Sequence, residues 1–68
     1  MNKTSYTAVE RYGKLIARVR NSTPAEKAER QALKTAFEAD GLTVKRIGSV
    51  VVISDDAIEL TLRKFKIG

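Results

Sequence analysis

Residues 42–68 read LTVKRIGSVVVISDDAIELTLRKFKIG, and most of the expected fold follows from this stretch. Apolar side chains recur there in three runs, which are separated by Gly48-Ser49 and by Asp55-Asp56. Alternation of apolar and polar residues is typical of half-buried strands, and dipeptides of these two kinds favour tight hairpin turns. The stretch therefore predicts a three-stranded antiparallel meander, with strands at about 42–47, 50–54 and 57–66.

The two turns also predict how the strands are aligned. If each loop has two residues, Val44 and Ile58 both pair with Ile53 and Val51 pairs with Leu60, all on one face of the sheet. The opposite face then carries apolar and polar side chains together: Ile47, Val50, Val52 and Phe65 among Lys45, Glu59, Thr61 and Arg63. The middle strand is apolar at every position from 50 to 53, which indicates cover on both faces.

Two helices are expected before the sheet. Thr7-Ala8-Val9-Glu10 matches a capping box and predicts a helix over about 8–20, although Gly13 weakens it and leaves a strand over 15–19 as the alternative. A second capping box, Thr23-Pro24-Ala25-Glu26, predicts a helix over about 24–39 that ends before Gly41.

These elements predict an α+β fold with two helices packed on one face of the meander, in the order α-α-β-β-β. The 68 residues are expected to form one domain, 1–68, in which residues 1–6 are either a flexible arm or a cover for the outer sheet face. A core of this size offsets chain entropy only marginally. A homodimer or a bound partner is therefore expected to add stability.

The residues that most enzymes use are missing from this chain. It contains no histidine, cysteine or tryptophan, so the usual general base, thiol nucleophile and imidazole ligand are absent. We therefore expect no enzyme, no cofactor, no metal site and no small-molecule substrate. Asp55 and Asp56 are the one alternative, as ligands of a divalent ion, but turn formation explains them better. No apolar run approaches the roughly 20 residues of a membrane span, so we expect no membrane contact and a cytoplasmic location.

The positive charge points to a polyanionic partner. Lys and Arg number 13 against 8 Asp and Glu, giving +5, and such an excess attracts nucleic acid or an acidic protein surface. Candidate nucleic-acid contacts fall into two sets. The second helix supplies Lys27, Arg30, Gln31 and Lys34, and the strands supply Lys45, Arg46, Arg63, Lys64 and Lys66.

The helix set resembles, in architecture, a helix-turn-helix with a β-hairpin wing, in which the second helix enters the major groove. The chain departs from that pattern because it has no third helix and because Glu26, Glu29 and Glu38 border the basic stripe. A solvated helix face is the alternative interpretation of this set. For the strand set, the alternative is that lysines protect a sheet edge from unwanted pairing.

Two functions remain in competition. The leading hypothesis is a non-enzymatic nucleic-acid-binding accessory or regulatory module that contacts phosphates through the basic helix face and the strand ends. The alternative is a protein-interaction adaptor or inhibitor that uses the apolar outer sheet face, with its positive charge matched to an acidic target. The predicted interface residues of the second function are Ile47, Val50, Val52 and Phe65.

Overall fold

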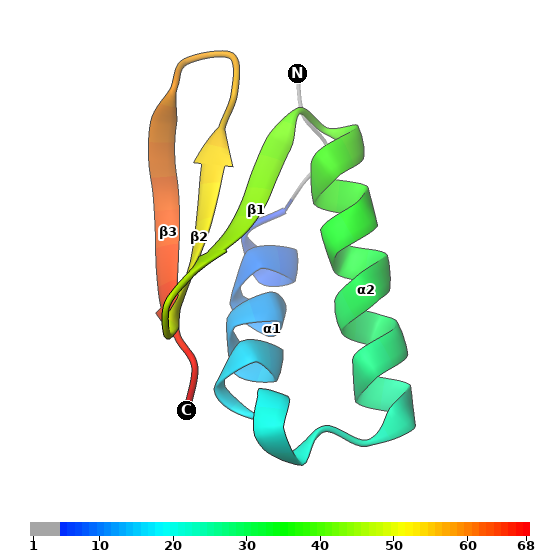
Figure 1. Cartoon of the computed structure of the whole chain (residues 1–68). Helices are drawn as coiled ribbons and strands as arrows, with labels where there is room; N and C mark the ends of the chain where they lie inside the picture. Colours follow the sequence, from blue (N-terminus) through cyan, green and yellow to red (C-terminus); the bar gives the residue numbers. More distant parts are fainter. Residues whose placement is uncertain (1–4) are drawn as a thin grey trace.

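The computed structural model describes residues 5–68, which form two helices followed by a three-stranded sheet (Figure 1). The elements are α1 (Tyr6–Ala17), a 3₁₀ turn (Val19–Asn21), α2 (Pro24–Ala39), β1 (Leu42–Ile47), β2 (Val50–Asp55) and β3 (Leu60–Lys66). The strand order is β1-β2-β3, with both pairs antiparallel. The predicted α+β class and the order α-α-β-β-β are confirmed.

The first helix begins earlier than the sequence pattern predicted. Its N-cap is Ser5, whose hydroxyl oxygen accepts a hydrogen bond from the Ala8 amide at 3.1 Å. The predicted cap at Thr7 is wrong, because the Glu10 carboxylate that would complete it accepts a hydrogen bond from Arg63 of β3 instead. The alternative of a strand over 15–19 is also excluded. Of the expected arm at residues 1–6, the first four lie outside the described residues, and Ser5 and Tyr6 belong to the start of α1.

The second helix has the local structure that its sequence predicts. The Thr23 hydroxyl oxygen accepts from the Glu26 amide at 3.1 Å, and the Glu26 carboxylate accepts from the Thr23 amide at 2.9 Å. The helix stops before Gly41, whose φ of +83° lies in the left-handed region that favours glycine after a helix end. Both signals depend on neighbouring residues, so the chain settles them locally.

The first hairpin is also as predicted. Gly48 and Ser49 form a two-residue loop, Ile47 pairs with Val50, and Val44 pairs with Ile53. Gly48 has a φ of +61° at the first loop position, as in a type II′ turn, whose twist matches that of the flanking strands.

The second hairpin differs from its prediction, because its loop has four residues, 56–59, rather than two. An Asp55 carboxylate oxygen accepts from the Ala57 amide at 2.9 Å, and the Thr43 hydroxyl donates to an Asp56 oxygen at 2.6 Å. These bonds hold the two aspartates in an extended turn. The predicted pairs of Ile53 with Ile58 and of Val51 with Leu60 are therefore wrong.

A bulge in β3, and not the longer loop, changes which side chains face the helices, because two extra loop residues leave the alternation of faces unchanged. Val51 pairs with Phe65 and Ile53 pairs with Arg63, and an irregularity between Ile53 and Ser54 leaves Leu62 unpaired as a bulge. Since Val51 and Ile53 are buried against the helices, Phe65 and Arg63 lie on that same face. Their predicted position on the outer face is wrong.

The core lies between this face of the sheet and the two helices. Its buried cluster comprises Tyr12, Ile16, Phe37, Leu42, Val51, Ile53 and Ile67. The rings of Tyr12 and Phe37 meet edge to face, with centroids 5.4 Å apart, and so join α1 to α2. No helix within residues 5–68 is both long enough and apolar enough to cross a membrane.

Candidate nucleic-acid interface

The structure divides the predicted nucleic-acid contacts among four places. Three of the four residues predicted on α2 line a cleft together with one residue of β1: Arg30, Gln31 and Lys34, with Arg46. Lys27 is exposed outside that cleft. Lys45, Lys64 and Lys66 lie on the outer sheet face, since they pair with Val52 and Val50 in the register. Arg63 lies on the opposite, helix-facing side.

The cleft has a volume of about 250 Å³ and opens between the two helices and β1. We call it the basic cleft. Arg30, Gln31, Lys34 and Arg46 form its polar part, and its apolar lining consists of Tyr12, Ile16, Val19, Val44, Val51 and Ile67. The lining therefore combines cations with a floor that belongs largely to the core.

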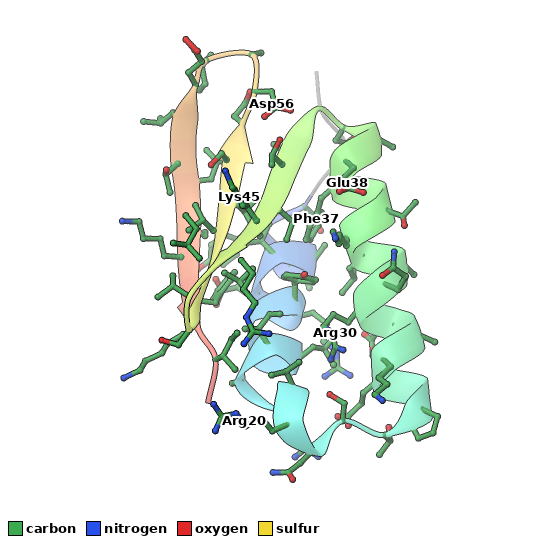
Figure 2. The ribbon with its side chains drawn as sticks, in the orientation of Figure 1. Arg20, Arg30, Phe37, Glu38, Lys45 and Asp56 are labelled. Carbon is green, nitrogen blue, oxygen red and sulfur yellow. The ribbon has the colours of Figure 1, made fainter. Side chains whose placement is uncertain are left out.

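Two hydrogen bonds hold the arginines of the basic cleft in place. Arg30 extends from α2 toward α1 (Figure 2), and its guanidinium donates to the Ser22 hydroxyl oxygen at 2.9 Å. Ser22 precedes the α2 cap, so the connection between the helices positions this side chain. The Arg46 guanidinium donates to the Gly48 carbonyl at 3.0 Å, which ties it to the first hairpin turn.

The basic cleft contains no acidic residue among those that line it. Within residues 5–68, Arg30, Lys34 and Arg46 form no ion pair, whereas three other arginines do. Those pairs are Arg11 with Glu29, Arg18 with Glu26 and Arg63 with Glu10. Cations without a carboxylate partner are available to an anion, so the basic cleft is the place where α2 and β1 offer positive charge together.

The acids that border the α2 stripe are largely engaged elsewhere. Arg11 donates two hydrogen bonds to Glu29, at 2.7 and 2.8 Å, and these lower the pKa of Glu29. The pKa of Glu26 is lowered chiefly by the hydrogen bond from the Thr23 amide and further by Arg18. Both carboxylates are neutralised by partners from α1 or its end, which reduces their repulsion of phosphate.

The outer sheet face is a second surface, made by the side chains that point away from the helices. By the register these are Thr43, Lys45, Ile47, Val50, Val52, Ser54, Thr61, Lys64 and Lys66. Lys45 and Lys64 flank Val52, and Ile47 and Lys66 flank Val50. This face thus has an aliphatic centre and a lysine border, and the acid nearest to it is Asp56, which accepts from the Thr43 hydroxyl at the loop end.

Sequence reasoning assigned Arg46 to the wrong group of residues. It was grouped with Lys45 as part of one strand cluster, although adjacent strand residues point to opposite faces. Arg46 follows Leu42 and Val44 at alternate positions of β1, and this alternation places it on the helix-facing side. No comparable signal existed for Arg63 and Phe65, because their face depends on the bulge at Leu62.

The acidic residues do not gather into a cation site in the described part of the chain. Among residues 5–68, no three Asp or Glu side chains lie close enough together to hold a metal ion. Asp55 and Asp56 each accept a hydrogen bond within the turn.

Comparison of the chain with protein-family models, with curated proteins and with solved structures found no match. The fold and the site themselves define the class: a small basic α+β domain with a cation-lined cleft beside its second helix.

Proposed function

We propose that this protein is a non-enzymatic nucleic-acid-binding module that holds phosphates of a single strand in the basic cleft. One observation carries the proposal: Arg30 and Lys34 of α2 and Arg46 of β1 line a single cleft that no acid enters. Guanidinium groups bind phosphate oxygens in pairs, and an ammonium adds a point charge. The site would then contribute affinity through phosphates rather than through chemistry on the bound strand.

A single strand fits the basic cleft better than a duplex does. Arg30 and Lys34 of α2 lie in a concavity that α1 and β1 also form, so this part of the stripe is not a free ridge for a major groove. A flexible strand can place phosphates at the rim and bases over the apolar lining. Gln31 offers an amide that both donates and accepts, as a base edge requires.

The test compares two variants that each lose three positive charges. The cleft variant is Arg30→Gln/Lys34→Gln/Arg46→Gln, and its matched control is Lys45→Gln/Lys64→Gln/Lys66→Gln on the outer sheet face. Binding to single-stranded RNA, single-stranded DNA and duplex DNA is measured by fluorescence anisotropy from low to physiological salt. We expect the cleft variant to lose affinity for single strands and to lower the salt slope by about two, since each phosphate contact contributes about 0.7. The control should stay close to the parent protein.

Two outcomes would reject the proposal. The first is no binding of the parent protein to any of the three nucleic acids at low salt. The second is an equal loss in both variants, which would mean that net charge and not the basic cleft governs the interaction.

The outer sheet face supports a second candidate function, contact with a protein that carries acids. Phe65 is no longer part of that surface, but Ile47 is 59% exposed beside Val50 and Val52. Aliphatic side chains bordered by lysines suit a partner with both apolar and acidic groups.

A further inference from the structure

The loop end of the β2–β3 hairpin exposes large aliphatic side chains next to acids. Ile58 is 62% exposed and Leu60 is 55% exposed. Asp55, Asp56 and Glu59 lie in the same segment, which contains no Lys or Arg from 55 to 60. We call residues 55–60 the acidic hairpin end. A cluster of exposed aliphatic side chains commonly marks an interaction surface.

The sheet carries the opposite charge toward its other end. The β1–β2 turn lies at the far end of the sheet from the β2–β3 loop (Figure 1), and Ile47 and Val50 pair beside that turn. Lys66 pairs with Val50, and Lys45 and Lys64 pair with Val52 one step further along. Acidic and basic apolar surfaces are thus separated along the strand direction of one molecule.

From this polarity we propose that the protein associates head to tail, with the acidic hairpin end of one copy docked on the outer sheet face of the next. Charge complementarity identifies the second copy as the occupant. Asp56 and Glu59 would meet lysines, and Ile58 and Leu60 would cover the aliphatic centre of the face. A symmetric contact between two hairpin ends would instead bring like charges together.

The outer sheet face is a better receptor for the hairpin than the basic cleft. The gain from docking is proportional to the apolar area removed from water. The cleft floor is already buried by the core, with Tyr12 at 3% exposure, so little area remains there. Ile47 at 59% exposure offers far more. The association therefore leaves the basic cleft free.

Because the donor and acceptor surfaces differ, a single contact uses only one of the two surfaces of each copy. A pair of copies joined by one contact keeps one unused hairpin end and one unused face, so chains of copies lengthen as concentration rises. Association should weaken with salt, since exposed charge pairs are screened within about 8 Å at physiological ionic strength.

Two variants test the proposal by complementation. The hairpin variant is Ile58→Ser/Leu60→Ser, and the face variant is Lys45→Glu/Lys64→Glu. Sedimentation velocity of nuclease-treated protein at low salt should show chains for the parent and monomers for each variant. Mixing the two variants should restore one interface and give a one-to-one heterodimer that grows no further. Circular dichroism confirms that each variant is folded.

Three results would overturn the proposal. The first is a parent protein that stays monomeric up to millimolar concentration. The second is a mixture of the two variants that forms no heterodimer. The third is a parent protein that forms a closed dimer, which the mixture of the variants does not restore. A charge-swap pair, Glu59→Lys with Lys64→Glu, adds a test that leaves the aliphatic groups in place, and the mixture should again associate. The cleft variant should assemble like the parent, which separates this inference from the proposed nucleic-acid site.

Discussion

At the scale of single residues, Gly13 is explained by a neighbour that is remote in sequence. A Cβ atom built on Gly13 would lie 2.4 Å from Cε1 of Phe65. Glycine within a helix costs about 1 kcal/mol relative to alanine, so the sequence marks Gly13 as a weak point of α1. The structure shows what that cost permits: the Phe65 ring packs directly on the helix backbone, beneath the Arg63 guanidinium, which is 5.0 Å from the ring centroid.

We expect Gly13→Ala to destabilise the protein in spite of its better helix propensity. Overpacking costs about 1–3 kcal/mol, against a propensity gain of about 1 kcal/mol. Chemical denaturation measures the difference in the free energy of unfolding. The matched partner is Phe65→Leu, which makes room for the methyl group. The double variant should be more stable than the sum of the single effects predicts, and strict additivity would show that the two residues do not compete for space.

Glu59 is the second residue with an unusual backbone. Its φ of +52° lies in the left-handed region, where a non-glycine side chain costs about 1–2 kcal/mol. We expect Glu59→Gly to raise the free energy of unfolding by up to about 1 kcal/mol, after allowance for the greater freedom of glycine in the unfolded chain. The control is Glu38→Gly on the exposed side of α2, which should lose about 1 kcal/mol. A loss at both positions would contradict the strained backbone at Glu59.

At the scale of elements, the two helices are joined by charge as well as by apolar packing. Arg11 of α1 binds Glu29 of α2 in a two-pronged ion pair, and Arg18 at the end of α1 lies 3.2 Å from Glu26 in the α2 cap. Glu26 therefore takes part both in the capping box and in the connection between helices. The sequence suggested the first role but not the second.

These carboxylates make the helix pair sensitive to acid. The pKa of Glu29 is lowered by the hydrogen bond from Arg11, and that of Glu26 by the Thr23 amide. A lowered pKa contributes stability that is complete above the unfolded value, about 4.3, and is lost as the pH falls through the folded value. We expect the free energy of unfolding to be flat from pH 7 to pH 5 and to decrease below that.

The variant Glu29→Gln isolates the contribution of one pair. It should be less stable than the parent at pH 7 and should converge with it as the pH falls, because protonation removes the same interaction. Urea denaturation at pH 7 and at pH 3 measures this difference. Glu38→Gln is the matched control, since Glu38 is exposed and forms no ion pair with any residue of 5–68. If the free energy of unfolding of Glu29→Gln differed from that of the parent by the same amount at both pH values, this explanation would be ruled out.

At the scale of the whole molecule, some cationic side chains form ion pairs that join elements of the fold, and others have no acidic partner among residues 5–68. Arg11, Arg18 and Arg63 hold elements together, while Arg30, Lys34 and Arg46 line the basic cleft and three lysines border the outer sheet face. The net charge of +5 says nothing about this division. It follows from the packing of helices on one face of the sheet, which separates the two free sets.

Short-range signals were sufficient for α2, β1, β2 and the first hairpin. The capping box at Thr23, the left-handed glycines at 41 and 48, and the alternation of apolar residues in β1 each depend on atoms only a few positions apart. These short-range signals also predicted that Arg30, Gln31 and Lys34 lie together on α2, so that part of the candidate site could be predicted from the sequence.

Long-range packing settled everything that concerned β3 and the completed cleft. Arg63 faces the helices where Glu10 is its partner, 53 positions away in the chain, and Phe65 faces Gly13. The bulge at Leu62 turns both side chains toward the helices, and no local pattern predicts it. Arg46 meets Arg30 and Lys34 for the same reason: sequence rules assign a side chain to a face, but only the docking of α2 beside β1 makes those faces border one space.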